Sequence, residues 1–425
     1  MKSNSRRSLA EKTLYVHPMT QSGARLIAAA FRAQGLNARV LPPSDSETIE
    51  IGAYYLAGDE CFPTKITVGD YLKVTRAEGF DPARTAFMMP TADGPCRFGQ
   101  YSNLLEKTLK DIGLDDVEIL SPSSKDGYSS IGGTEFFKTA WIGLIASDII
   151  RKMLLKTRPY ETVKGTTNAV YEQSLQKAER ILENRELSFG KRLSLLRDGL
   201  VGIRDDFRAI DADYIKGKPL IAVVGEIFCR HNRFANENMI VKLEQYGAET
   251  WLADIGEWVL YTDWSAKSTM VRLGKIFSKE MLTAKVKKIF MKNYEHKLLE
   301  PFHDDFVGYE EPPDVSVMMK MSEPYLPPSG ALGEMSVSLG KSCYSYKKGV
   351  DGIVDISPFS CMNGIVTEAI YPSFSKDHNN IPCRVFYYDG INQDLDRDIG
   401  IYMELVKGYM NRKTVERRYN KFFHQ

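Results

Sequence analysis

Six cysteines are the residues of this sequence with the most distinctive chemistry. They are Cys61, Cys96, Cys229, Cys343, Cys361 and Cys383. A thiolate binds metals, attacks electrophiles and forms disulfides. Six cysteines in 425 residues are too sparse for a disulfide scaffold. No CxxC pair occurs, which excludes zinc ribbons and ferredoxin-type runs as local motifs.

The residues that flank four of these cysteines are more informative than the spacing. The four motifs are GDECFP (58–63), GPCRFGQY (94–101), VGEIFCRHNRFANE (224–237) and PFSCMNG (358–364). Three of them are expected where a strand ends and a turn begins, and ligands of open α/β sheets collect outside these carboxyl ends. The alternative is that each cysteine packs as a small hydrophobic residue, which suits Cys343 and Cys383 best.

Arginine directly follows three of the cysteines. A nearby cation lowers the pKa of a thiol and offsets the negative charge of thiolate-ligated metal. Arg97, Arg230 and His231 are therefore candidate catalytic residues, for charge balance or proton supply. The alternative for these three is a loop cap or an ion pair. Glu60 and Glu226 are expected to cap backbone N–H groups.

Alternating strand and helix patterns predict how these loops are positioned. Strands are expected at 12–17, 38–41, 85–89, 117–120, 220–224, 249–252, 352–356 and 383–388. Helices are expected between them, as at 23–35, 103–113 and 236–247. This alternation favours an α/β fold with two Rossmann-like, doubly wound lobes of parallel strands.

The domain organisation follows from where the strand signals stop. An N-terminal α/β lobe is expected over 1–132 and a helical segment over 133–216. A second α/β lobe over 217–390 contains a helical insertion near 266–299, and a helix near 330–346. Residues 391–425 are predicted to form a C-terminal helix, from Asp394 to Arg418.

Composition excludes several classes of protein. Hydrophobic residues make up 43% and charged residues 26%, which is ordinary for a globular protein. A net charge of +1 favours neither nucleic acid nor an anionic membrane. Residues 1–12 lack the apolar core of a secretory signal, and the apolar stretch 136–150 is shorter than the ~20 residues that span a bilayer. We expect a cytoplasmic protein.

Common nucleotide and hydrolase motifs are missing from the sequence. There is no GxGxxG after a strand, no HExxH and no GxSxG. Leu339-Gly340-Lys341-Ser342 ends like a phosphate-binding loop, but Met335 replaces the first glycine and the approach is helical. Any ATP hydrolysis is therefore expected in a partner protein.

The four cysteine motifs, with the Tyr388-Asp389-Gly390 turn, resemble the 2-hydroxyacyl-CoA dehydratase component family. The resemblance runs from about Lys12 to about Leu405, and is greatest to the activase-associated, double-cubane-cluster reductases. It implies an iron–sulfur cluster in the cleft between the two lobes. It also implies that electrons arrive from a separate ATPase of the actin-like fold, which carries its own [4Fe–4S] cluster.

The resemblance implies cluster ligands as well. Cysteine at Cys61, Cys96 and Cys361 is the shared set, whereas relatives often have aliphatic residues at the other three positions. Six thiolates suit two cubanes joined by a sulfide, so the sequence predicts a double-cubane [8Fe–9S] cluster bound by all six cysteines. The predicted activity is an oxidoreductase that reduces a small molecule.

Two alternatives remain open at this stage. One is a 2-hydroxyacyl-CoA dehydratase-like subunit, a lyase, with a single [4Fe–4S] cluster. The other is a non-catalytic electron carrier or cluster scaffold. The resemblance also implies a homodimer.

Overall fold

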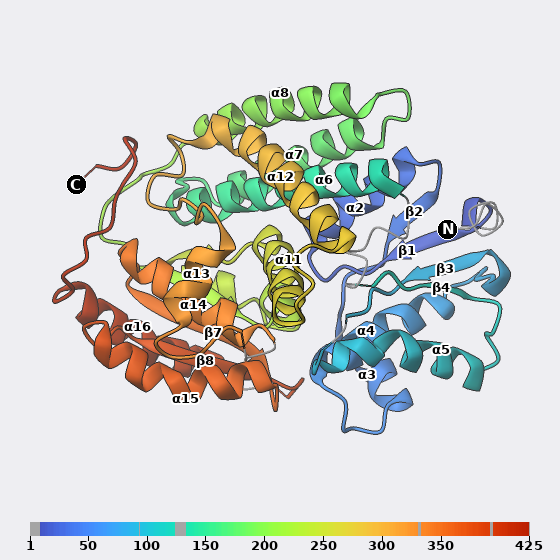
Figure 1. Ribbon diagram of the computed structural model, residues 1–425. Helices are drawn as coiled ribbons and strands as arrows, with labels where there is room; N and C mark the ends of the chain where they lie inside the picture. The colour runs from blue at the N-terminus through green and yellow to red at the C-terminus, as the bar shows by residue number, and fades with distance from the viewer. Residues whose placement is uncertain (1–8, 93, 124–132, 330–332, 392–393, 425) are drawn as a thin grey trace. The chain divides into compact units, whose positions relative to one another are not determined.

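Two compact units make up the chain, and each is described by itself. The computed structural model describes residues 9–92, 94–123, 133–329, 333–391 and 394–424 (Figure 1). Unit 1 comprises Met1–Ser147 and Ser174–Leu200, and unit 2 comprises Asp148–Gln173 and Val201–Gln425. The division falls within the three long helices α6 (Gly133–Thr157), α7 (Thr166–Glu183) and α8 (Phe189–Arg208). These helices occupy the segment predicted to be helical.

Each unit contains a four-stranded parallel sheet. The strands of unit 1 are β1 (Thr13–Val16), β2 (Asn37–Val40), β3 (Thr85–Met88) and β4 (Glu118–Leu120). Those of unit 2 are β5 (Leu220–Gly225), β6 (Glu249–Leu252), β7 (Gly352–Pro358) and β8 (Cys383–Tyr388). The strand orders are β2-β1-β3-β4 and β6-β5-β7-β8, which is the doubly wound arrangement. The predicted α/β class, its two parallel sheets and all eight strands are confirmed.

Apolar clusters pack on both faces of the unit 1 sheet. The helices here are α2 (Gln21–Ala33), α3 (Ser46–Tyr55), α4 (Phe62–Thr75) and α5 (Tyr101–Asp111), with short 3-10 turns η1 (Pro82–Arg84) and η2 (Arg97–Gln100). Leu14 and Val16 of β1 pack with Phe31 of α2 in one cluster. Phe87 of β3 packs with Tyr71 of α4 in another cluster. Successive strand residues thus serve opposite faces, as expected for a sheet covered on both sides.

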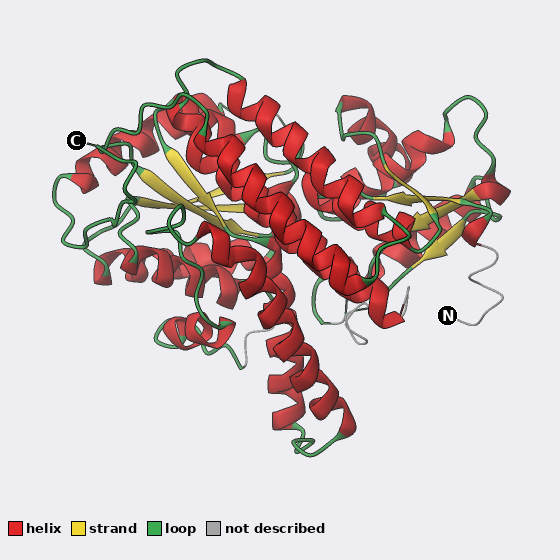
Figure 2. Ribbon diagram, turned by 90° about the horizontal axis from the view of Figure 1, so that it is seen from above, coloured by secondary structure: helices red, strands yellow, loops and turns green. Residues whose placement is uncertain are grey.

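The sheet of unit 2 also lies between helices, as the yellow strands among red helices in Figure 2 show. Unit 2 adds η5 (Arg158–Tyr160), α9 (Ile227–His231), α10 (Met239–Gln245), α11 (Ile255–Arg272), α12 (Lys279–Leu299), η6 (Glu300–Phe302), α13 (Val315–Ser322), α14 (Met335–Lys347), α15 (Met362–Asp377) and α16 (Leu395–Met410). Helices α14 and α15 pack together against strands, as do α10 and α16. A Cβ atom on Gly352 would meet Tyr402 and Val406 of α16, so this helix lies directly on β7.

The predicted C-terminal helix is too long. Helix α16 ends at Met410 and not at Arg418, and the described residues 411–424 that follow are not helical. The tail is instead held by side chains. Arg417 is buried and its Nη2 lies 2.6 Å from Glu249 Oε2, while Lys413 Nζ lies 2.7 Å from Asp351 Oδ1. These long-range ion pairs outweigh the helical propensity of the segment.

A buried lysine joins the helices of unit 2. Lys341 in α14 is 1% exposed; its Nζ lies 2.9 Å from Glu257 Oε2 of α11 and also contacts Glu311. Burial alone would lower the pKa of Lys341, but the two carboxylates outweigh it and hold this pKa above its usual value. The Leu339-Gly340-Lys341-Ser342 segment is helical, so the rejection of a phosphate-binding loop is confirmed.

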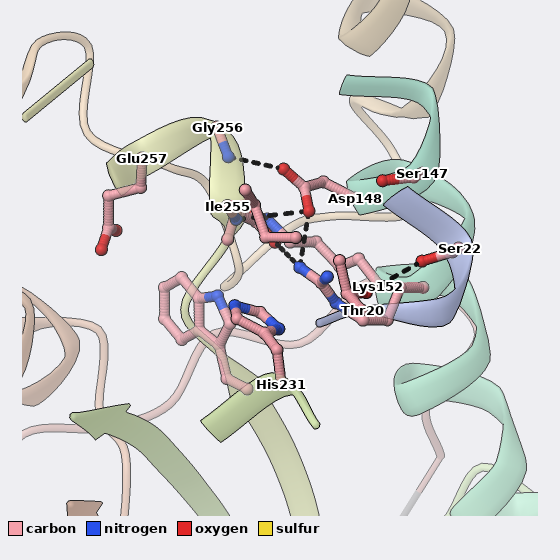
Figure 3. A network of polar contacts seen from close by, with 12 residues as sticks. Thr20, Ser22, Ser147, Asp148, Lys152, His231, Ile255, Gly256 and Glu257 are labelled. Carbon is pink, nitrogen blue, oxygen red and sulfur yellow. Dashed lines mark hydrogen bonds and ion pairs between the residues drawn. The ribbon is translucent and has the colours of Figure 1, made fainter. Parts of the chain in front are cut away.

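Further ion pairs connect Glu311 to α6. Lys152 Nζ lies 2.5 Å from Glu311 Oε1 and 3.1 Å from Asp254 Oδ2, and Arg151 joins Asp254 to Asp148. Figure 3 shows the Asp148 carboxylate pointing to the Gly256 amide, from which it accepts a hydrogen bond of 2.8 Å. Cations and carboxylates thus alternate from Glu257 to Asp148, so each buried charge has an opposite neighbour.

We predict that Lys341→Met destabilises the protein by about 3–5 kcal/mol, because it leaves a buried carboxylate at Glu257 without its cation. The measurement is urea-induced unfolding. Lys347→Met is the matched control, because Lys347 is exposed in the same helix. Equal stability of the two variants would show that the alternating charges do not stabilise unit 2.

Candidate functional site

The described residues include all six cysteines, and none of them is in a disulfide. Unit 1 contains Cys61 and Cys96, and unit 2 contains the other four. Within the described residues, no three His, Cys, Asp or Glu side chains are grouped so that they could hold a metal ion. The positions of the cysteine loops are therefore considered one by one.

The structure brings the Cys61 and Cys96 segments of unit 1 together. Arg97 Nη1 donates a hydrogen bond of 2.7 Å to the carbonyl oxygen of Asp59, which lies two residues before Cys61. The Cys61 Sγ atom lies 2.7 Å from the Tyr101 hydroxyl, at the start of α5. Two cysteines that are 35 residues apart in sequence are thus held in one region. Cys96 and Arg97 are exposed there.

Three cysteines occupy the same position relative to a helix. The N-cap residues of α4, η2 and α15 are Cys61, Cys96 and Cys361. Each has an extended backbone, and its thiol accepts no capping hydrogen bond from the first N–H groups of its helix. The first N–H groups of a helix have no partner within the helix and carry a partial positive charge. This position stabilises a thiolate, which is the form that ligates metal. The set coincides with the three cysteines that the resemblance implied as shared.

In unit 2, Cys229 and Cys361 follow the two central strands of the sheet. Strands β5 and β7 are neighbours, and Gly225 at the end of β5 pairs with Ile356. Their following connections leave in opposite directions, so this edge is the topological switch point at which α/β sheets bind ligands. Gly225 has φ +114°, and a Cβ atom there would lie 2.1 Å from the Ile356 carbonyl oxygen. Only glycine fits this close approach.

Cys383 lies at the opposite edge of the same sheet. It pairs with Ile353 at the start of β7, whereas Pro358 pairs with Tyr388 at the carboxyl end. Five residues at about 3.3 Å each place Cys383 about 16 Å from that end. Metal–thiolate bonds are only about 2.3 Å long, so the structure does not bring Cys383 and Cys361 together as ligands of one cubane.

Cys343 lies near Cys383 and not in one of the cysteine loops. Cys343 is buried in α14, and the two thiols interact electrostatically. Burial raises the pKa of Cys343 to about 12, and burial likewise raises the pKa of Cys383 well above its usual value. Without a bound metal, both side chains are therefore protonated thiols at neutral pH.

Arg230 and His231 are buried beside the switch point, at the carboxyl end of β5. Arg230 is 2% exposed; its Nη1 donates to the Gly225 carbonyl oxygen at 2.8 Å, and its Nε lies 3.3 Å from His231 Nε2. Burial, with the charges of Arg151 and Arg230, holds the pKa of His231 well below its usual value. His231 is therefore a neutral imidazole at neutral pH. This arrangement braces the end of β5.

Three glutamates near the cysteine loops accept hydrogen bonds from backbone N–H groups. Glu226 accepts hydrogen bonds from the Phe228 and Cys229 amides, and Glu60 accepts from the Gly58 amide, so the predicted capping roles are confirmed. Glu334 was not predicted. Its Oε2 accepts from the Ile227 amide, and burial with the nearby charge of Glu226 raises the pKa of Glu334 to about 8. The Glu334 side chain is therefore protonated at pH 7.

A second pair missed by sequence analysis lies in unit 1. His17 directly follows β1, and its Nε2 lies 3.0 Å from Asp70 Oδ2. Asp70 is fully buried and also accepts from Ser44 and Thr48. A histidine at the carboxyl end of a central strand was a visible signal, but its partner 53 residues away was not.

A small pocket lies between α6 and β6 in unit 2. Its lining includes Arg151, Lys156, Thr250 and Tyr309. Lys156 is 2% exposed and faces the Tyr214 ring at 5.2 Å. Burial lowers the pKa of Lys156 to about 8 although Asp305 and Glu249 oppose this. The buried ammonium therefore costs stability wherever it is charged.

Comparison with models of known protein families finds no match, and no curated protein matches the sequence significantly. No helix of the described residues is both long and apolar enough to cross a membrane.

We predict that Lys156→Met gains stability relative to the natural protein at pH 7 and loses this advantage at pH 10.5. The folded pKa near 8 lies below the unfolded value near 10.4, so the unfolded chain binds the extra proton between these values. Stability of the natural protein then rises with pH over this window by about 3 kcal/mol. Chemical denaturation at several pH values measures the difference, and a difference that is constant with pH would contradict it.

We also predict an order of thiol reactivity. In metal-free, reduced protein at pH 8, iodoacetamide should modify exposed Cys96 at least about tenfold faster than Cys343, because burial keeps Cys343 protonated. Peptide mass spectrometry after timed quenching gives the rate at each residue. Equal rates at Cys96 and Cys343 would contradict the positions described above, unless circular dichroism showed that the protein had unfolded.

Proposed function

We propose that this chain is an iron–sulfur component of the 2-hydroxyacyl-CoA dehydratase type, with Cys61, Cys96 and Cys361 as ligands of a [4Fe–4S] cluster. The observation that carries the proposal is that these three cysteines, and none of the other three, are N-cap residues. The resemblance of their flanking motifs supports the same set. Such a cluster supplies single-electron transfer at low potential.

The donor chemistry of these residues fits an anionic cluster. N-cap thiols are next to backbone N–H groups and the positive end of a helix, which offset negative charge. The guanidinium of Arg97 adds a full positive charge directly after Cys96 and ties that loop to the Cys61 loop. Arg97 is therefore proposed for charge balance. Arg230 and His231 are proposed as positioning residues, because both are buried and joined to each other.

The single cluster is favoured over the double cubane predicted from the six cysteines. A double cubane with six thiolates would need Cys343, which lies inside α14, and Cys383. Cys383 also lies at the edge of the sheet opposite to that of Cys361. Cys229 follows β5 on the same edge as Cys361, so it is the one additional cysteine that the sheet topology supports as a further ligand.

The proposed electron donor is a separate ATPase with its own [4Fe–4S] cluster. Nucleotide-binding signatures are missing from the sequence, and Lys341, the only residue that suggested one, is buried between two carboxylates. The proposed substrate is a small molecule, with an acyl-CoA first among the candidates. A lyase of this type and a low-potential reductase therefore remain the two candidate activities.

We predict about four iron and four acid-labile sulfide per chain in anaerobically purified protein. Cys61→Ser, Cys96→Ser and Cys361→Ser should each lose at least about half of the iron, because a cubane with too few thiolates is released. Cys343→Ser and Cys383→Ser are matched controls that should retain it. Colorimetric iron and sulfide assays with EPR after reduction make the measurement.

Two outcomes would contradict the proposal. About eight iron per chain, with loss in all six variants, would establish the double cubane. Absence of iron from protein reconstituted with iron and sulfide would remove the iron–sulfur function altogether.

A further inference from the structure

The end of α11, the start of α12 and the loop between them carry large apolar side chains that are exposed. Each is between 44% and 101% exposed, and Phe277 in the loop is fully exposed. We call this the hairpin surface. It is formed by Val271, Leu273, Ile276, Phe277, Leu282, Val286, Ile289 and Phe290. Exposed apolar side chains that gather in this way mark an interaction site.

Helix α12 has an apolar stripe on its outer side as well as on its inner side. Met281 and Met291 are 3% and 1% exposed and pack inwards. Leu282, Val286 and Ile289 are 65%, 44% and 68% exposed. At about 100° per residue, these three side chains fall within an arc of about 60°. The outer stripe is about 11 Å long at 1.5 Å per residue, so it can lie along a membrane surface but is too short to span a bilayer.

Lysines border the outer stripe on both sides. In the same helical projection, Lys285 falls about 40° beyond Ile289 and Lys279 falls about 20° beyond Val286. Both lysines are exposed, and neither has a carboxylate within 4 Å among the described residues. Glu280 is the one acidic residue of 271–292, and it falls about 160° from the first residue of the stripe. An apolar stripe between lysines, with the acidic residue turned away, is typical of helices that lie in a membrane interface.

The region around the stripe is basic although the chain as a whole is nearly neutral. Residues 271–292 contain seven Lys or Arg and one Glu. Lys288 and Lys292 pair with Asp314 and Glu295, so the region and its paired carboxylates carry 7 − 3 = +4. The whole chain carries +1, which leaves 1 − 4 = −3 for the remaining residues. An anionic surface therefore attracts the hairpin and repels the rest, which orients the chain. Sequence analysis missed this preference because it used the charge of the whole chain.

We propose that the hairpin surface binds an anionic lipid membrane, with its apolar side chains at the boundary between headgroups and acyl chains. Phe277 stands out from the loop and does not line a groove, because its side chain is fully exposed. A fluid bilayer accepts such a protruding group, whereas a protein partner would need a pocket of matching shape. Apolar burial and the attraction of lysines to anionic headgroups then act together. This inference does not depend on the proposed function, since no cluster ligand belongs to the hairpin surface.

Flotation of the full chain with lipid vesicles tests the proposal. The probes are vesicles of phosphatidylcholine alone and vesicles that mix phosphatidylcholine and phosphatidylglycerol equally. The natural protein should partition at least about tenfold more strongly into the anionic vesicles. Raising sodium chloride from about 0.05 to 0.5 M should weaken this binding, because salt screens exposed charges. Failure to float with the anionic vesicles, or equal binding to both kinds, would overturn the proposal.

Charge reversal locates the contact on the chain. The double variant Lys279→Glu and Lys285→Glu should lower partition into anionic vesicles at least about thirtyfold. The matched control is Lys107→Glu with Lys110→Glu, which makes the same change of net charge at exposed residues of α5. Its partition should stay within about threefold of the natural value. Equal losses in the two double variants, with circular dichroism unchanged, would show that net charge and not the hairpin surface is responsible.

A tryptophan in the loop tests whether the surface enters the bilayer. In difference spectra against the natural protein, Phe277→Trp should emit at shorter wavelength with anionic vesicles and be quenched by lipids brominated on the acyl chain. Val163→Trp, at an exposed apolar residue outside the hairpin surface, should show neither effect. Vesicle binding without quenching at position 277 would contradict insertion. A natural protein that binds no vesicle, but whose sedimenting mass falls in Phe277→Asp, would assign the surface to a protein contact and overturn the proposal.

Discussion

Parallel alignment of the strands is the constraint on which the candidate site depends. Parallel neighbours end at the same edge, so β5 and β7 deliver Cys229 and Cys361 to one side of their sheet. The close approach of Gly225 to Ile356 fixes the register at that edge, since a side chain at this position would force the strands apart. The same alignment places Cys383 at the other edge and so divides the cysteines into two groups. Within unit 2, sheet topology thus separates Cys383 from Cys229 and Cys361.

Buried charge is the second feature that organises unit 2. The alternating cations and carboxylates from Glu257 to Asp148 connect α14, α11 and α6, so these helices can pack only where each charge meets its partner. Desolvation makes such groups costly, and a paired arrangement is therefore more a device for specifying one packing than a source of large net stability. Arg230 extends this principle to the sheet edge, where its hydrogen bond to the Gly225 carbonyl oxygen ties α9 to the end of β5.

Sequence reasoning succeeded where the determinants are local. The strands were predictable because short apolar runs such as Leu220–Val224 are bounded by proline and glycine, and the cysteine motifs indicated turns that became N-caps. Contacts between distant residues were not predictable. Glu334, the His17–Asp70 pair and the partners of Lys341 depend on residues tens of positions away. The end of α16 was missed for the same reason, because Arg417 is held by Glu249 and not by its own helix.

The central claim is that Cys61, Cys96 and Cys361 bind one iron–sulfur cluster. A crystal structure of anaerobically prepared protein, with anomalous diffraction recorded at the iron absorption edge, tests it most directly. The account predicts iron peaks within bonding distance of the sulfur atoms of these three cysteines and no iron bonded to Cys343 or Cys383. Iron at either of those two sulfur atoms, or at none of the three N-cap cysteines, would contradict it.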